Sequence, residues 1–301
     1  MIVVVAPGQG SQTPGSLAPW LELDGVADHL ERLGAAADLD LVSLGTTADA
    51  DTIRRTEVAQ PLIVAAGLVA AAALERPVVA VAGHSVGEIT AAVLAGVLDE
   101  QDGMRLIATR GRAMAEAAAR TPTGMSAVVG GDEQAVVERI EGLGLSPANR
   151  NGGGQIVASG ALDALEALRA EPPAGARVIP LQVAGAFHTE FMRPAVEALE
   201  EFAGTLRPAA PTARLWTNRD GSEVADGRAF LDLLVGQVAS PVRWDRTMES
   251  FTAAGITGLV ELTPAGTLVG LAKRALKGLP AVAVKSPADL PAARELLDRT
   301  P

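Results

Sequence analysis

The sequence predicts an α/β fold in which a large part, built on a parallel β-sheet, carries a smaller part of βαββαβ order as an insertion. Two observations support this prediction. Short apolar runs alternate with helical segments through most of the chain, which is typical of layered α/β folds. The stretch 123–187 departs from that alternation, because its short strands and helices follow one another in the order βαββαβ.

The large part begins with Ile2 to Ala6, a run dominated by β-branched residues that ends at Pro7 and predicts a buried parallel strand. An alanine-rich helix is expected from Gln60 to Leu74, with Pro61 at its start, where helices favour proline. Further strands are expected at 77–82, 213–217, 257–262 and 279–284, and further helices at 88–98, 102–120, 190–206, 227–238, 244–254 and 268–276.

The small part has four expected strands and two expected helices. The strands lie at 125–129, 146–150, 155–159 and 177–181, and the helices at 133–141 and 162–169. This order is the split βαβ pattern of ferredoxin-like folds. The sequence therefore predicts a ferredoxin-like subdomain at 123–187, inserted into a large α/β subdomain that comprises 1–122 and 188–301.

Composition excludes several classes of protein. The 301 residues are 48% apolar, which is ample for a core, and they include no cysteine, which excludes disulfide scaffolds, thiol nucleophiles and cysteine-ligated metals. Three histidines offer little for a metal centre, and we expect none. The net charge of −11 argues against binding to nucleic acid or to an anionic membrane. The longest apolar run, 62–74, falls short of the roughly 18 residues of a membrane span, so we expect a cytoplasmic protein.

Residues 83–87 read Gly-His-Ser-Val-Gly and fit the G-x-S-x-G pattern of a nucleophile elbow, with a strand before the turn and a helix after it. Such a turn forces Ser85 outward, and its glycines let backbone segments pass closely. The N–H of Val86 would point at the same space and stabilise an oxyanion. The large subdomain is accordingly expected to be α/β-hydrolase-like. The alternative for Ser85 is a serine that caps the helix.

A serine nucleophile needs a base, and only His29, His84 and His188 are available. His29 lies in an acidic stretch and is expected to be a solvated surface residue. His84 adjoins Ser85, and consecutive side chains diverge at a tight turn, so His84 is expected to pack or to orient its neighbours. His188 lies where a strand ends and a helix begins, which favours it as the base over a capping or core histidine. No histidine follows it, which disfavours the Ser…Asp/Glu…His order of an ordinary esterase or lipase.

Several short motifs follow one another over nearly the whole chain. They are Pro-Gly-Gln-Gly-Ser-Gln at 7–12, the serine motif with Glu88, Thr-Arg-Gly-Arg-Ala-Met at 109–114, Asn-Arg-Asn-Gly at 149–152 with Gln155, Ala-Phe-His at 186–188, Pro-Val-Arg-Trp at 241–244 and the helix 268–274. In this combination and order they resemble the malonyl-CoA:acyl-carrier-protein transacylases and the related acyltransferase domains of polyketide synthases.

This resemblance implies roles for the residues around the serine. Ser85 matches the nucleophile that becomes acylated, and His188 matches the base. The main-chain N–H groups of Gln9 and Val86 would form the oxyanion hole. Gln237 matches the position whose main-chain carbonyl orients the histidine, so that no carboxylate is needed as a third member.

The resemblance also implies residues that select the acyl group. Arg110 matches the arginine that pairs with the malonyl carboxylate, a pairing for which the planar guanidinium is well suited. Helical spacing alone leaves Arg105 and Arg112 equally plausible, and favours a surface role for all three. Phe187 matches an aromatic of malonyl-selective members, where serine is associated with methylmalonyl. Asn151 matches a residue near the active-site cleft.

The function that the resemblance implies is malonyl transfer from malonyl-CoA to the phosphopantetheine thiol of an acyl carrier protein, through a malonyl-serine ester. No cofactor is expected, because the coenzyme A thioester is the substrate. Three alternatives stay open: a serine thioesterase or esterase, an acyltransferase that uses another acyl-CoA, and a non-enzymatic interaction domain. Carrier proteins are typically acidic, as is this chain. Docking would therefore need a basic patch, for which the candidates, if they converge, are Arg169, Arg177, Lys273, Arg274 and Lys277.

Overall fold

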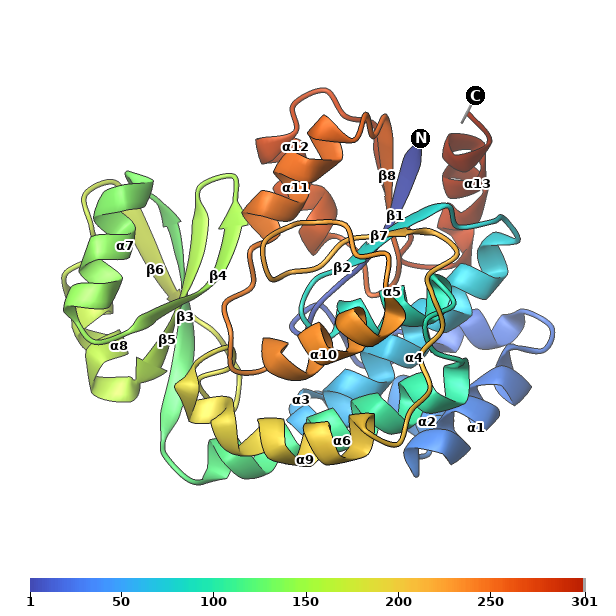
Figure 1. The fold of residues 1–301 in the computed structure, drawn as a ribbon, viewed down its shortest axis with the longest axis horizontal. Helices are drawn as coiled ribbons and strands as arrows, with labels where there is room; N and C mark the ends of the chain where they lie inside the picture. The colour runs from blue at the N-terminus through green and yellow to red at the C-terminus, as the bar shows by residue number, and fades with distance from the viewer. Residues whose placement is uncertain (300–301) are drawn as a thin grey trace.

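The N-terminal strand β1 (Ile2–Ala6) lies at the centre of a five-stranded parallel sheet in the computed structural model, which describes residues 1–299 (Figure 1). The strand order is β7-β2-β1-β8-β9. The other strands are β2 (Ala80–Gly83), β7 (Arg214–Leu215), β8 (Gly258–Glu261) and β9 (Ala281–Ala283). All five residues of β1 are buried, because helices cover both faces of the sheet.

Alternate residues of β1 point into two separate hydrophobic clusters. Ile2 and Val4 pack with α4 (Thr56–Leu74), α5 (Gly87–Leu94) and α6 (Glu100–Ala119). Val3 and Val5 pack with α11 (Trp244–Ala253) and α12 (Thr267–Ala275). The strand therefore joins two cores, one on each face, and its carboxyl end reaches the level of the turn that contains Ser85.

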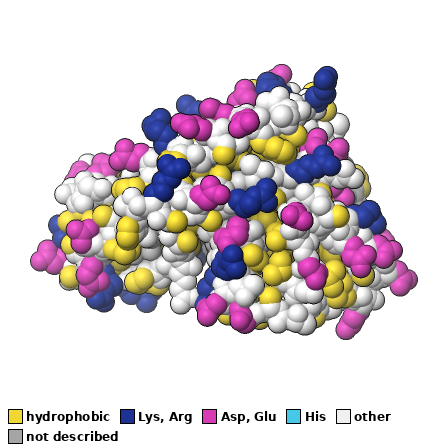
Figure 2. Space-filling view, turned by 90° about the horizontal axis from the view of Figure 1, so that it is seen from below, with side chains coloured by type: hydrophobic (Ala, Val, Ile, Leu, Met, Phe, Trp, Pro, Cys, Tyr) yellow, Lys and Arg dark blue, Asp and Glu magenta, His cyan; other side chains and the backbone are white. Residues whose placement is uncertain are grey.

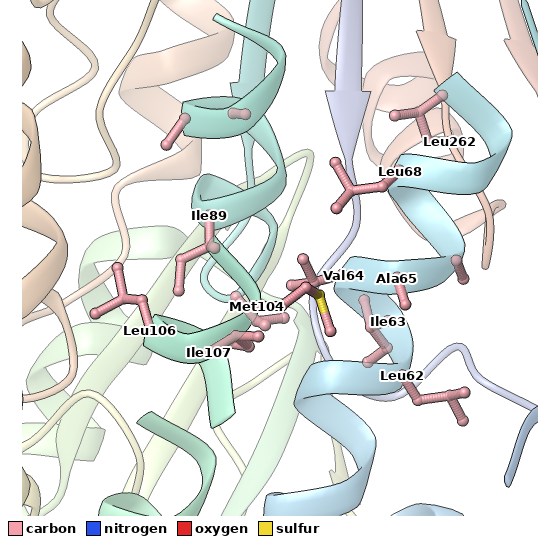
Figure 3. Packing of buried hydrophobic residues seen from close by; sticks show 14 of the residues in the cluster. Leu62, Ile63, Val64, Ala65, Leu68, Ile89, Met104, Leu106, Ile107 and Leu262 are labelled. Atoms are coloured by element: carbon pink, nitrogen blue, oxygen red, sulfur yellow. The ribbon is translucent and has the colours of Figure 1, made fainter. Parts of the chain in front are cut away.

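Helix α4 is long and apolar enough, by length and composition alone, to cross a membrane. However, 83% of the relevant window is buried inside the protein, where α4 packs mainly on α6 and α5. Figure 3 shows Leu62, Val64 and Leu68 of this helix together with Met104 and Ile107 of α6. The expected start of α4 was wrong: the helix begins at Thr56, so Pro61 lies inside it and removes one internal hydrogen bond.

Several helices of the large part were not expected from the sequence. They are the 3-10 helix Ala18–Glu22, α1 (Val26–Ala37), α2 (Leu41–Thr46), α3 (Ala50–Arg54), the 3-10 helix Pro287–Asp289 and α13 (Leu290–Asp298). In α1 only one stripe is buried, including Leu30 and Leu33, and charged residues and alanines make up most of the rest. The remaining elements, the 3-10 helix Glu190–Met192, α9 (Arg193–Ala203) and α10 (Gly227–Gln237), lie close to the expected positions.

The second sheet is antiparallel and has the order β4-β5-β3-β6, at the left of Figure 1. Its elements are β3 (Thr123–Gly130), α7 (Glu133–Gly142), β4 (Ser146–Gly152), β5 (Gln155–Ala161), α8 (Leu162–Ala170) and β6 (Ala176–Pro180). The predicted order βαββαβ is confirmed. One face packs on α7 and α8, whereas Met125 and Val157 on the other face join the large core.

Two main-chain segments attach the sheets to each other. Arg150 N–H donates to the carbonyl of Val242 at 2.9 Å, and Val242 N–H donates to the carbonyl of Ala148 at 2.8 Å. The second attachment follows β6, where the chain returns to the large part. There Ala186 N–H donates to Thr123 Oγ1, and the carbonyl of Phe187 accepts from Ser159 Oγ, so both residues are held by the small sheet. The cavity described next lies along this junction.

Candidate active site

Ser85 lies in the tight turn between β2 and α5, with a left-handed main chain (φ +53°). A Cβ on Gly83 would come within 1.9 Å of the Gly87 carbonyl carbon, and one on Gly87 within 2.2 Å of the Ala6 carbonyl oxygen. Both flanking positions therefore require glycine. The N–H of Ser85 donates to Asn218 Oδ1 at 2.7 Å, which helps to hold the unfavourable conformation.

His188 faces Ser85 across the junction, with Nε2 2.7 Å from Ser85 Oγ. Its Nδ1 lies 2.9 Å from the main-chain carbonyl of Gln237, and since a carbonyl only accepts, Nδ1 carries the proton. Nε2 is then free to accept from the serine hydroxyl. Burial, and then the positive charge of Arg110, lowers the pKa of His188 to about 3, so the imidazole is neutral at pH 7 and is in the form that a base needs.

Arg110 is buried on α6, only 3% exposed, and points toward the same space. Its guanidinium donates to Gln60 Oε1 at 2.7 Å and to Gln237 Oε1 at 2.8 Å, and one nitrogen lies 3.4 Å from Ser85 Oγ. Burial lowers the pKa of Arg110 to about 10, which leaves it charged at neutral pH. Arg105 and Arg112 on the same helix are exposed, so the structure places Arg110 alone of these three arginines at the serine.

Gln9 and Val86, whose main-chain N–H groups are the expected oxyanion donors, both line the cavity that contains Ser85. Within the part of the chain that the structure describes, neither group donates to another residue. Val86 also forms the N-cap of α5, where the helix dipole adds partial positive charge. These two donors can therefore receive an oxygen that becomes negatively charged near Ser85.

His84 and Asn151 form a contact between the two sheets. His84 Nε2 donates to Asn151 Oδ1 at 2.8 Å, and Asn151 in turn donates to Gln155 Oε1 at 2.9 Å. The His84 ring packs edge-on against Trp244, with ring centres 5.6 Å apart. Burial lowers the pKa of His84, which keeps it neutral, and its Nε2 is engaged by Asn151.

A cavity of about 270 Å³ connects these groups. Phe187, only 6% exposed, lines it next to His188, together with Met125 and Ala127 of the small sheet. Residues from both sheets thus enclose one site. Among residues 1–299, no group of three or more His, Cys, Asp or Glu side chains is placed to hold a metal ion.

Comparison with known proteins identifies the family. The sequence matches the acyl transferase domain family over residues 3–293. It is 56% identical over 296 residues to the malonyl CoA-acyl carrier protein transacylase of Mycobacterium tuberculosis, covering 96% of this chain and 98% of that protein. The chain belongs to the malonyl-CoA:acyl-carrier-protein transacylase family. The resemblance predicted from its motifs is therefore confirmed.

Solved structures of transacylases have the same fold as this chain. A crystal structure of the M. tuberculosis enzyme superimposes with a TM-score of 0.94 at 54% identity, covering 98% of this chain and 99% of that one. A malonyl-transacylase in complex with the acyl-carrier protein of a type II polyketide synthase has a TM-score of 0.91 at 30% identity, covering 98% and 99%. The parallel sheet and the separate antiparallel sheet are thus features shared with transacylases.

A larger hollow, of about 560 Å³, lies elsewhere, between α1, α4 and α13. His29 lines it, and here the expectation of a solvated histidine was wrong. The side chain of His29 is only 12% exposed, and its Nε2 lies 3.0 Å from both carboxylate oxygens of Glu100. The acidic residues next to His29 in sequence gave no sign of this partner, which comes from the start of α6. The hollow contains none of the groups around Ser85.

The five basic residues considered for docking do not form one patch. Arg169 and Arg177 lie on α8 and β6, and Lys273, Arg274 and Lys277 lie on α12 or just after it, on a different part of the fold (Figure 1). Arg169 is paired with Glu166, whereas Arg274 donates to the Gly153 carbonyl at the junction. On the face seen in Figure 2, acidic and basic side chains are interspersed.

Sequence reasoning missed three supporting residues of the site. Gln60 accepts from Arg110, and Asn218 supports the Ser85 turn. Glu88 accepts hydrogen bonds from Asn218 N–H and from the Gln237 side-chain amide. Glu88 directly follows the serine motif in sequence, and its presence there on a buried helix was the one available signal. For Asn218, 133 residues from Ser85, local pattern offered none.

Proposed function

We propose that this chain transfers a malonyl group from malonyl-CoA to the phosphopantetheine thiol of an acyl carrier protein. The observation that carries this proposal is the buried Arg110 guanidinium, 3.4 Å from Ser85 Oγ. A fixed positive charge this close to a nucleophile favours an acyl group that bears a carboxylate near its reacting carbonyl. The names of the relatives, malonyl CoA-acyl carrier protein transacylases, point to the same substrates.

In the first half-reaction, His188 Nε2 takes the proton of Ser85 Oγ as the oxygen attacks the thioester carbon of malonyl-CoA. The carbonyl oxygen becomes an oxyanion and accepts from the N–H groups of Gln9 and Val86. The tetrahedral intermediate collapses, the carbon–sulfur bond breaks, and the coenzyme A sulfur leaves with the proton from His188. A malonyl ester of Ser85 remains.

In the second half-reaction, the thiol of the carrier protein gives its proton to His188 and attacks the ester carbonyl. Ser85 Oγ leaves and regains the proton. The malonyl carboxylate paired with Arg110 offsets the charge that otherwise lowers the pKa of His188. The correct substrate therefore makes the imidazole a stronger base, whereas an acetyl group, which has no charge, does not.

The other predicted site residues have supporting roles in this proposal. Gln237 orients His188 through its main-chain carbonyl and holds Arg110 through its side chain. Phe187 narrows the cavity against a branched acyl group, a preference worth about 1–3 kcal/mol per methyl group. His84 and Asn151 keep the two sheets in place around the substrate. The reaction uses only these groups and the thioester, so it requires no cofactor.

The division of the chain follows the same proposal. We infer a large α/β-hydrolase-like subdomain at 1–122 and 188–301, and a ferredoxin-like subdomain at 123–187. The nucleophile turn between a parallel strand and a helix supports the first description. The antiparallel order β4-β5-β3-β6, with α7 and α8 on one face, supports the second. Location in the cytoplasm and the absence of a metal site stay predictions.

Intact-mass measurement after mixing with malonyl-CoA tests the proposed function. We expect a malonyl adduct that Ser85→Ala abolishes and that a holo acyl carrier protein removes while itself gaining malonyl. Release of free malonate without carrier protein would favour a thioesterase instead. A stronger adduct with another acyl-CoA in a panel of donors would favour a different acyltransferase. An adduct that persists in Ser85→Ala would overturn the assignment of the nucleophile.

A further inference from the structure

Glu88 is a buried carboxylate that the mechanism above does not use. It lies one helical turn after Ser85 on α5, with only 1% of its surface exposed. Each of its two carboxylate oxygens accepts a hydrogen bond: Oε1 from Asn218 N–H at 2.6 Å, and Oε2 from the Gln237 side-chain amide. A buried carboxylate without hydrogen bonds lowers the stability of the folded protein. The charged form of Glu88 therefore depends on these two hydrogen bonds.

The two partners of Glu88 support different members of the site. Asn218 accepts from Ser85 N–H at 2.7 Å and donates to the Gly83 carbonyl at 2.6 Å, which holds the nucleophile turn. The Gln237 amide donates to the Ser85 carbonyl at 3.1 Å, and its oxygen accepts from Arg110 at 2.8 Å. Glu88 is therefore hydrogen-bonded directly to Asn218, which holds Ser85, and to Gln237, which holds Arg110.

We propose that Glu88 is a positioning residue, whose carboxylate fixes the orientation of the Gln237 amide and thereby holds Arg110 toward Ser85. This inference rests on the proposed function. A carboxylate only accepts, so Gln237 presents its NH₂ group to Glu88 and leaves its oxygen for Arg110, which only donates. The opposite orientation would place the NH₂ group against the guanidinium, donor against donor. Glu88 itself does not reach the substrate cavity.

The charge of Glu88 depends on pH in the neutral range. Burial raises the pKa of Glu88 to about 7, and the hydrogen bonds from Asn218, Gln237 and Thr217, followed by the positive charge of Arg110 on α6, partly oppose this increase. Its other neighbours, Thr217, Asn218 and Gln237, are neutral, and His188 on the far side of Gln237 is neutral as well. Protonation of Glu88 turns one of its carboxylate oxygens into a hydroxyl donor. Because that hydroxyl would face an N–H donor, the hydrogen bond to Gln237 or the one to Asn218 is lost.

The unmodified protein provides the first test. Initial rates of malonyl and acetyl loading from the two coenzyme A thioesters are measured by intact mass between pH 6 and 8. We expect the malonyl-to-acetyl ratio to fall by about tenfold from pH 8 to pH 6, as Glu88 gains its proton while the malonyl carboxylate stays ionised. A ratio that does not change over this range would overturn the inference.

The variant Glu88→Gln supplies the second test, because glutamine has the same shape but accepts on one oxygen only. At pH 8 we expect its malonyl-to-acetyl ratio to be about 10- to 100-fold below that of the unmodified protein, the effect of one lost hydrogen bond to a charged group, and to stay constant with pH. The control Glu261→Gln changes a buried carboxylate that caps α12, and it should lower stability without making the ratio independent of pH.

The outcomes separate the two proposals. No loading of Ser85 by either thioester would contradict the proposed function. A malonyl-to-acetyl loading ratio that keeps its value and its pH dependence in Glu88→Gln would contradict only the role of Glu88. A general loss of stability cannot imitate the expected result, since it lowers malonyl and acetyl loading together.

Discussion

Ser85 Oγ and His188 Nε2 lie 2.7 Å apart although 103 residues separate them in the sequence. Both residues have a left-handed main chain, with φ of +53° and +62°, which is uncommon for residues other than glycine. Each is held by a long-range bond, Ser85 N–H to Asn218 Oδ1 and His188 N–H to the Val238 carbonyl. These bonds therefore hold both residues in strained main-chain conformations that keep the pair within hydrogen-bond distance.

Arg110→Ala is expected to lower malonyl loading about 100-fold or more, because a buried ionic partner of the substrate is lost. Acetyl loading should fall much less, since an acetyl group makes no ion pair. Rates of adduct formation with the two thioesters measure this difference. The control Arg112→Ala, an exposed arginine on the same helix, should change neither rate. Equal losses with both thioesters in Arg110→Ala would indicate a structural role.

Phe187→Ser is expected to raise the use of methylmalonyl-CoA relative to malonyl-CoA by about tenfold, because the cavity gains room for one methyl group. Competition between the two thioesters, followed by intact mass, gives the ratio directly. Phe202→Ser, at a partly buried phenylalanine on α9 outside the cavity, serves as the control for lost stability. If both variants shift the preference alike, Phe187 does not select the acyl group.

Gly87→Ala is expected to destabilise the protein by about 1–3 kcal/mol and to displace Ser85, because the new Cβ would clash with the main chain of Ala6. Chemical denaturation measures the stability, and adduct formation measures the displacement. Gly142→Ala near the end of α7, where a Cβ meets open space, should be neutral or slightly stabilising. A fully stable and active Gly87→Ala protein would contradict the close packing of the turn.

His188 should make the protein less stable in acid. Its pKa is lowered to about 3 in the folded state, so between that pH and its ordinary value near 6.5 the unfolded chain binds the extra proton. The contribution of His188 to the free energy of unfolding is therefore fully present above pH 6.5 and is lost as the pH falls toward 3. Between pH 7 and 5.5 we expect the unmodified protein to lose about 1 kcal/mol more than His188→Gln does. Denaturation curves of both proteins at the two pH values measure these free energies of unfolding. Equal losses of stability in the two proteins would contradict the lowered pKa of His188.

The features that could be predicted from the sequence are those encoded locally. The strand, turn and helix around Ser85 follow one another in sequence, and so do the six elements of the small sheet. Helix α1 also carries a local signal, because its buried residues Val26, Leu30, Leu33 and Ala37 recur at helical spacing with charged residues on the opposite face, so this helix was predictable from the sequence. The network around Glu88 could not be predicted, since Asn218 and Gln237 are 130 and 149 residues away and meet it only after folding.

The arginine shows the same limit in another form. Arg105, Arg110 and Arg112 share one helix, and their spacing gave no reason to prefer one of them. Only the packing of α6 against α4, which brings Gln60 beside Arg110, separates the buried residue from its exposed neighbours. The family resemblance had already pointed to Arg110, because the position of an arginine in a family motif reflects where that residue lies in the folded proteins of the family.

The peptide bond between Phe187 and His188 joins residues that belong to different scaffolds. The Phe187 carbonyl is held by Ser159 of the small sheet, whereas His188 is held by the carbonyls of Gln237 and Val238 in the large part. We therefore expect substitutions in the small sheet to move the cavity wall at Phe187 more than they move the imidazole of His188.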